Sequence, residues 1–211
     1  VELAELASSA ALTVIDRLVQ RTQSGHHRFQ LGSGKLKDVL MHAMQKGADL
    51  LIFDQDLAPA QLRAIDEITD LTVIDRTQLI LDIFAQRAHS REGKVQVELA
   101  QLRYLLPRLS GQGTSLSRLG GGIGSRGPGE TKLETDRRRI RERIDHLERE
   151  IDGFARHQDQ RRSRRVRQAF PVLSIVGYTN AGKSTLLNVL TKSEVSTAPR
   201  VFETLDTTSR R

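Results

Sequence analysis

The sequence contains no cysteine and no tryptophan, and only 4% of its 211 residues are aromatic, whereas 28% are charged. Without cysteine, disulfide bonds and thiolate chemistry are excluded. No apolar run approaches the roughly 18 residues that cross a bilayer, and the first residues lack the pattern of a secretory signal. We therefore expect a cytoplasmic protein without a membrane span. The scarcity of large rings favours a helix-rich, partly elongated chain.

The positive charge is concentrated in one stretch of the sequence. The net charge is +7, and residues 137–167 hold twelve arginines, no lysine and six acidic residues. The arginine guanidinium forms bidentate hydrogen bonds with phosphates and stacks on bases, so this stretch is suited to structured RNA. A solvated helix face with ion pairs between successive turns has the same composition. The charge pattern leaves both interpretations open.

The first third of the chain alternates between strand-like and helical patterns. Apolar runs predict strands at 14–19, 50–53 and 71–74. Helical spacing predicts helices at 2–10, 35–46 and 59–68, and Pro59 suits the first turn of the last of these. Strands that alternate with helices are typical of a parallel sheet. We expect a small parallel α/β unit over residues 1–76.

Residues 77–165 carry two long helical patterns separated by a glycine-rich stretch. The first pattern, 78–109, predicts one helix with a weak point near Gly93, and the second has an apolar seam between Leu133 and Phe154. Seams of this kind predict an antiparallel helical hairpin of the coiled-coil type. Helices of about 25 to 30 residues would form an arm roughly 40 Å long.

The stretch between the two helices, residues 110–130, is longer than a hairpin connection requires. It contains eight glycines together with Arg118 and Arg126. Its composition favours a flexible linker, but its position at the tip of an arm favours a contact loop. The candidate RNA contacts are Arg118, Arg126, Arg137, Arg138 and Arg139.

A phosphate-binding loop follows in residues 166–211. Gly177 to Ser184 match G-x-x-x-x-G-K-[ST], after a predicted strand at 172–176 and before a predicted helix at 185–190. Lys183 would neutralise phosphate charge, Ser184 would bind Mg²⁺, and Asn180 lies where the loop passes the terminal phosphate. The alternative interpretation is an ordinary glycine turn, but it does not explain why a lysine and a serine follow the second glycine. The candidate binding residues are Gly177, Tyr178, Thr179, Asn180, Ala181, Gly182, Lys183, Ser184 and Thr185.

A polar, threonine-rich segment begins near Phe202, about twenty residues beyond the loop. A threonine here could complete the Mg²⁺ shell when the γ-phosphate is present, as in nucleotide switches. Spacing alone does not choose among Thr204, Thr207 and Thr208. The candidate segment is Phe202, Glu203, Thr204, Leu205 and Asp206.

Several long blocks resemble the HflX family, in the Obg-HflX group of translation-factor-like GTPases. They are Asp75–Ala88, Gln96–Leu102, Leu106–Leu109, Gly120–Glu130, Leu133–Arg138, Gly177–Thr185 and Thr204–Asp206. The resemblance implies a small parallel α/β unit, a long-helix hairpin and the start of a P-loop GTPase domain. It also implies GTP or GDP with Mg²⁺ as cofactors, and Ser184 and Thr204 as metal ligands. The implied partner of this expected monomer is the large ribosomal subunit with its rRNA, and the implied role is splitting or rescuing stalled ribosomes under stress.

The 211 residues contain neither the D-x-x-G nor the N-K-x-D segment that would follow the loop in a GTPase domain. We therefore expect a truncated chain that binds nucleotide weakly and does not hydrolyse it, and guanine specificity rests on the resemblance. No catalytic residue is identifiable. Two alternatives to a Mg²⁺-dependent GTPase remain: an rRNA-binding module whose nucleotide site is only regulatory, and a P-loop ATPase.

Overall fold

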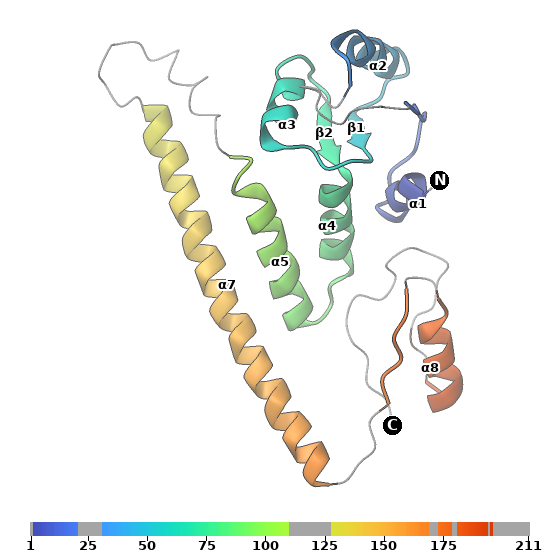
Figure 1. Cartoon of the computed structure of the whole chain (residues 1–211), viewed down its shortest axis with the longest axis vertical. Coiled ribbons are helices and arrows are strands. Elements are labelled where there is room, and N and C mark those ends of the chain that lie inside the picture. Colours follow the sequence, from blue (N-terminus) through green and yellow to red (C-terminus); the bar gives the residue numbers. More distant parts are fainter. Residues whose placement is uncertain are drawn as a thin grey trace. The chain divides into compact units, whose positions relative to one another are not determined.

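A computed structural model describes residues 2–20, 31–109, 128–168, 173–178, 181–193 and 195 (Figure 1). The chain divides into two compact units, Val1–Asp82 and Ile83–Arg211, and one helix runs across the division. The elements are α1 (Glu2–Ser9), α2 (Ser33–Gln45), β1 (Leu50–Phe53), α3 (Pro59–Asp66), β2 (Thr72–Asp75), α4 (Arg76–Arg87), α5 (Arg91–Leu105), α7 (Pro128–Arg167) and α8 (Lys183–Thr191).

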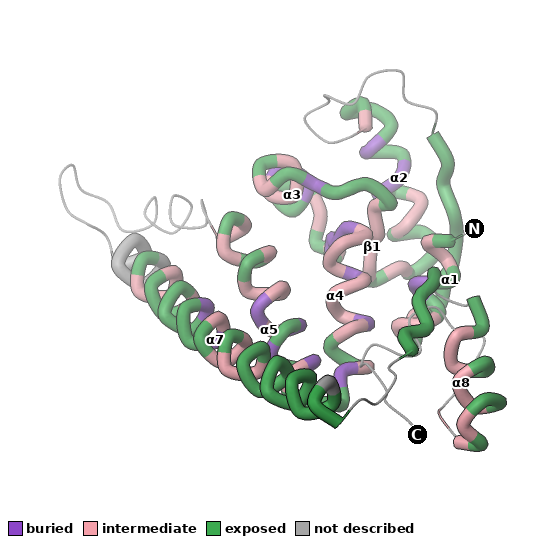
Figure 2. Tube along the Cα trace, turned by 60° about the horizontal axis from the view of Figure 1, so that its bottom comes forward, coloured by how far each residue is buried: buried purple, intermediate pink, exposed green. Residues whose placement is uncertain are grey.

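The first unit contains the small parallel sheet that the strand and helix patterns predicted. β1 and β2 pair in parallel, with Leu50 opposite Thr72 and Phe53 opposite Asp75. A right-handed crossover is the usual connection between such strands, and α3 lies within this one. The core of the unit is formed by Leu36, Leu40, Leu57, Ile65 and Val73, all buried. Figure 2 shows buried stretches on both α2 and α3.

The predicted strand at 14–19 is not observed, which corrects the expected strand-helix-strand-helix-strand order to two strands. These residues form no strand ladder with any part of the chain that the structure describes. Their apolar side chains are largely exposed; Val19, for example, is 93% exposed. A β-branched run has the propensity for a strand, but a strand also needs a partner for its backbone groups. Propensity alone therefore gave the wrong prediction here.

The junction of β2 and α4 is organised by a buried carboxylate. Asp75 is 2% exposed, and its two oxygens accept hydrogen bonds from the backbone N–H groups of Leu57 at 3.0 Å and Gln78 at 2.9 Å. The bond from Gln78 satisfies one of the free N–H groups at the start of α4. This side chain therefore joins the end of β2, the loop before α3 and the first turn of α4.

The long helix predicted at 78–109 is two helices instead. α4 ends at Arg87 and α5 begins at Arg91, so the break falls a few residues before Gly93. Ser90 causes the new start, because its Oγ accepts a hydrogen bond from the Gly93 N–H at 2.9 Å. A glycine marks the place where the pattern weakens, but the capping serine sets the boundary.

α5 and α7 form the predicted antiparallel pair. Their shared core consists of Val95, Leu99, Ile144 and Leu147, flanked by partly buried apolar residues such as Phe154. Ion pairs lie alongside this seam: Arg91 with Glu150, Glu98 with Arg143, and Arg103 with Glu148. The apolar spacing of both sequences therefore gave the correct arrangement. The glycine-rich stretch 110–127 lies outside the described residues.

No helix within the described ranges is long and apolar enough to cross a membrane. The strand predicted at 172–176 is also not observed: residues 173–178 are extended but form no ladder with any described segment. A parallel strand depends on neighbouring strands for its hydrogen bonds, so an apolar run does not create one by itself.

Candidate functional site

The candidate nucleotide site lies where residues 173–178 approach the start of α8. α8 begins at Lys183, two residues earlier than the sequence predicted. Gly182 precedes it in the left-handed conformation, at φ +77° and ψ 14°. Residues with a Cβ adopt this conformation only at a cost in free energy, which explains why the motif has its second glycine at this position. The first helical bond runs from the Leu186 N–H to the Gly182 carbonyl at 2.9 Å.

The loop folds back on its own beginning. A Cβ added at Gly177 would lie 3.7 Å from both Ala181 Cβ and Lys183 Cδ. Lys183 Nζ donates to the Tyr178 carbonyl at 2.5 Å, and the Ala181 N–H donates to the same oxygen at 3.3 Å. The ammonium group is therefore held against the backbone at the beginning of the loop.

The start of α8 has the donors that an anion requires. The N–H groups of Lys183, Ser184 and Thr185 belong to the first helical turn, which is the positive end of the helix dipole. Ser184 is half-buried and Thr185 is exposed. A wrapped glycine loop, a lysine ammonium and a serine hydroxyl are the groups that fit a phosphate with Mg²⁺. Thr179, Asn180 and the segment Phe202–Asp206, including Thr204, lie outside the described residues.

One residue of this region was missed by the sequence reasoning. Asn188 accepts from the Val195 N–H at 2.8 Å and donates to the Val195 carbonyl at 2.8 Å, and its Oδ1 also accepts from Ser193 Oγ at 3.1 Å. It thereby holds the turn that follows α8, where Lys192 is left-handed. The only available signal was an asparagine inside the apolar run 185–190.

The candidate RNA contacts on α7 lie near its beginning. Arg138 is 3.9 Å from Glu142 and Arg139 is 3.8 Å from Asp136, and both arginines are mostly exposed. Arg137 is half-buried, and its Nε has no hydrogen-bond partner among the residues that the structure describes. Arg118 and Arg126 lie outside the described residues. The structure therefore leaves Arg138 and Arg139 accessible at this end of α7.

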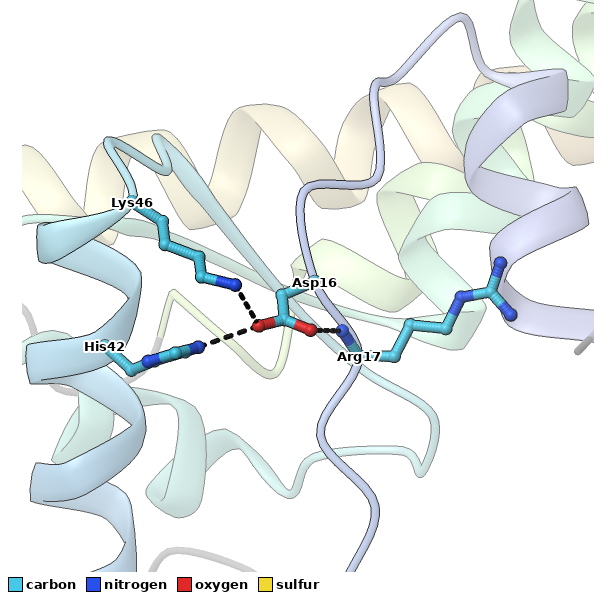
Figure 3. Close-up of polar contacts among 4 residues, drawn as sticks. All are labelled: Asp16, Arg17, His42 and Lys46. Atoms are coloured by element: carbon cyan, nitrogen blue, oxygen red, sulfur yellow. Dashed lines mark hydrogen bonds and ion pairs between the residues drawn. The ribbon is translucent and has the colours of Figure 1, made fainter.

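A second polar group, which we call the Asp16 cluster, lies in the first unit (Figure 3). Asp16 accepts from Lys46 Nζ at 2.6 Å, contacts His42 Nε2 at 2.7 Å and accepts from the Arg17 N–H at 2.7 Å. These bonds, that of Lys46 foremost, hold the pKa of the Asp16 carboxyl well below its usual range. The cluster attaches the extended segment 12–20 to the end of α2. In the described chain no group of three or more His, Asp or Glu residues is arranged to hold a metal ion.

Together these elements define an α/β protein with a small parallel sheet, a long-helix hairpin and the start of a P-loop GTPase domain. Family models match nearly the whole chain. A GTP-binding GTPase N-terminal region matches residues 1–85, a GTP-binding GTPase middle region matches 87–165, and a model described as a 50S ribosome-binding GTPase matches 172–211.

Curated relatives give a closer comparison. The GTPase HflX of Alkalihalophilus pseudofirmus is 51% identical over 210 residues, which cover 100% of this chain and 50% of the relative. The GTPase HflX of Escherichia coli is 46% identical, covering 100% of this chain and 49% of the relative. The chain belongs to the HflX family of GTPases, and it spans about half the length of the curated relatives it matches.

A solved structure of lower similarity has the same fold. A GTP-binding protein of Sulfolobus solfataricus, crystallised in complex with GDP, has a TM-score of 0.51 and 26% sequence identity. The match covers 90% of this chain and 49% of the archaeal one. The arrangement of the elements is therefore shared with a protein that has been seen with a guanine nucleotide.

Proposed function

We propose that this protein is a GTP-binding GTPase that associates with the large ribosomal subunit. The observation that carries the proposal is the Gly182–Lys183 turn before α8, in a chain of the HflX family. Two comparisons support it: the archaeal neighbour is described as a complex with GDP, and the model matching residues 172–211 is described as a 50S ribosome-binding GTPase. We propose functional boundaries of 1–76, 77–165 and 166–211.

In this proposal the backbone from Gly177 to Thr185 surrounds the phosphates of GTP or GDP. Lys183 leaves the Tyr178 carbonyl to bind the phosphates, and Ser184 and Thr204 hold Mg²⁺. The metal would supply positive charge beside the phosphates. Residues 202–206 would report whether the γ-phosphate is present. The fit rests on the left-handed glycine and the folded-back lysine at the start of α8.

Substitution of Lys183 tests the nucleotide site directly. Lys183→Ala should weaken binding of a fluorescent GDP analogue at least about tenfold, because it removes a charge-assisted bond to phosphate. Lys192→Asn, directly after the same helix, is a matched control, since it removes one charge and asparagine tolerates the left-handed backbone there. Equal affinity in the wild type and the Lys183 variant would refute the site. Tighter binding of ADP than of GDP by the complete protein would favour the P-loop ATPase.

The helical hairpin is the proposed ribosome-binding element. We place the rRNA contacts on the 110–130 stretch with Arg118 and Arg126, and on Arg137, Arg138 and Arg139 at the adjoining start of α7. The complete protein would act as a cytoplasmic monomer that splits or rescues stalled ribosomes under stress. Co-sedimentation of the chain with purified large subunits, with and without GTP, tests the association. Binding that Lys183→Ala leaves unchanged would favour an rRNA-binding module whose nucleotide site is only regulatory.

Turnover is expected to need more than these 211 residues. They include no D-x-x-G segment to contact the γ-phosphate and no N-K-x-D segment to read guanine after the loop. We propose that the 211-residue chain binds guanine nucleotide weakly and does not hydrolyse GTP, although the HflX family is one of GTPases. Phosphate release from GTP by the isolated chain is the measurement, and release at the rate of a full-length HflX GTPase would contradict the proposal.

A further inference from the structure

The last turns of α7 extend beyond α5, the helix that packs against the middle of α7. The last bond across the hairpin joins Gln158 Nε2 to both carboxylate oxygens of Glu92, at 2.8 and 2.9 Å, and Glu92 is the second residue of α5. From Asp159 onward no bond to α5 is found among the described residues. Figure 1 shows α7 continuing past the start of α5, and Figure 2 shows this end exposed. We call residues 159–167 the arginine end.

The arginine end carries a strong positive charge that forms no ion pair within the described part of the chain. Its arginines are Arg161, Arg162, Arg164, Arg165 and Arg167, and its only acidic residue is Asp159. All five arginines are exposed, and none forms an ion pair with a described residue. Farther back, where α5 covers α7, Arg143 binds Glu98 through two bonds of 2.7 and 2.8 Å. Within the charged stretch 137–167, Arg143 is therefore paired across the hairpin, whereas no described residue forms an ion pair with the arginine end.

The five arginines point to different sides of the helix. Successive residues of an α-helix are about 100° apart, so positions 161, 162, 164, 165 and 167 cover most of the circumference. An acidic patch on one side would engage only some of them. A partner with phosphates on several sides of a helix about 10 to 12 Å wide would engage most of them.

We infer that the arginine end binds the phosphate backbone of double-helical RNA. This inference rests on the RNA partner of the proposed function and adds a second contact surface to it. All basic residues of the arginine end are arginines. The planar guanidinium of arginine can bind one phosphate through two hydrogen bonds, whereas the ammonium of lysine acts as a point charge. A membrane surface fits less well, because helices that lie on lipid need an apolar face. Residues 159–167 contain a single large apolar residue, Val166.

The arginine end is separate from the RNA contacts proposed near the start of α7. From Arg139 to Arg161 the helix advances 22 residues, which is roughly 33 Å at 1.5 Å per residue. That separation exceeds the Debye length of about 8 to 10 Å, so the two charged surfaces act independently at physiological salt. Their contributions to RNA binding can therefore be measured one at a time.

The test compares two variants of the 211-residue chain that lose the same charge. One carries Arg161, Arg162, Arg164 and Arg165→Gln, which preserves helix propensity. The control carries Arg17, Lys35, Lys37 and Lys46→Gln, four exposed cations of the first unit that are far from the arginine end in sequence. Binding to an RNA duplex of about 20 base pairs is followed by fluorescence anisotropy over a salt series. Circular dichroism checks helix content, and an Arg→Lys variant at the same four positions keeps the charge.

The arginine-end variant should bind RNA about 10- to 100-fold more weakly, and the slope of log K against log salt should fall in magnitude by about 3. The control should keep the wild-type slope, and the Arg→Lys variant should keep most of it. Equal slopes for wild type and arginine-end variant would overturn the inference but leave the proposed function intact. A wild type that binds neither the duplex nor large ribosomal subunits would overturn both. Preference for phosphatidylserine vesicles over RNA, lost in the arginine-end variant, would also overturn the inference.

Discussion

The α/β unit and the helical hairpin are stabilised in different ways. In the α/β unit, the buried carboxylate of Asp75 links three segments inside the protein. In the hairpin, the charged groups that connect α5 with α7 lie at the edges of an apolar seam and remain accessible to water. Buried hydrogen bonds are costly to break, whereas exposed ion pairs contribute little. The comparison predicts that mutations of equal chemistry will differ in effect between the two regions.

The largest effect is expected in the seam of the hairpin. Leu147 is 0% exposed and belongs to the core that α5 and α7 share. Leu147→Ala should lower the free energy of unfolding by about 2 to 5 kcal/mol, because it leaves a cavity as well as losing buried surface. Urea denaturation followed by circular dichroism measures the change. His146→Ala, at the exposed neighbouring position, is the control and should stay within about 0.5 kcal/mol. Similar losses for both variants would mean that the seam is not a packed core.

The next effect is expected at the buried carboxylate of the α/β unit. Asp75→Asn places an amide NH₂ opposite one of the two backbone N–H donors, Leu57 or Gln78. One donor then loses its acceptor, which should cost about 1 to 3 kcal/mol. Hydrogen exchange should become faster at the amide of Leu57 or of Gln78, whichever loses its acceptor, with no change in α5 or α7. Asp70→Asn, at an exposed position, is the matched control. Unchanged exchange at both amides would show that the carboxylate is dispensable.

The elements that the sequence predicted correctly depend on local patterns. The strands 50–53 and 72–75 have short apolar runs bounded by turns, and the seam of α7 repeats at helical spacing. The turn at Gly182 was predictable because phosphate chemistry requires a glycine followed by lysine and serine. In each case a few neighbouring residues were sufficient.

The features that the sequence did not predict depend on distant partners. Residues 14–19 have strand propensity, but the described chain offers them no ladder, and Asp16 instead bonds to Lys46, thirty positions away. Asp75 was missed because aspartate side chains are normally exposed. Only the fold brings the Leu57 N–H within hydrogen-bonding distance of this carboxylate. The pairing of Arg143 with Glu98 could also not be predicted, because it depends on where α5 packs against α7. The hydrophobic periodicity of one segment does not show which other segment it pairs with.

A smaller effect is expected from the ion pair between Glu98 and Arg143. The hydrogen bonds from Arg143 to Glu98 are the main cause that raises the pKa of its guanidinium. Both side chains are more than 40% exposed, so solvent screens the pair and its coupling energy should be only about 0.2 to 1 kcal/mol. A double-mutant cycle of Glu98→Gln and Arg143→Gln measures this energy, which should shrink further in high salt. Coupling above about 2 kcal/mol would mean that the pair is as important as a buried contact.

The smallest effect is expected at the Asp16 cluster, which is exposed. Because the pKa of Asp16 is lowered in the folded protein, its contribution to stability is present above the unfolded value, near 3.8, and is lost as the pH falls through the folded value. Asp16→Asn should therefore unfold at slightly lower urea than wild type near neutral pH, and the difference should shrink in strong acid. Lys46→Gln should move the pKa of Asp16 upward in an NMR titration, because Lys46 is the largest cause of the shift. Lys37→Gln, on the same helix, should leave that pKa where it is. A difference between wild type and Asp16→Asn that grows as the pH falls would contradict the sign of this linkage.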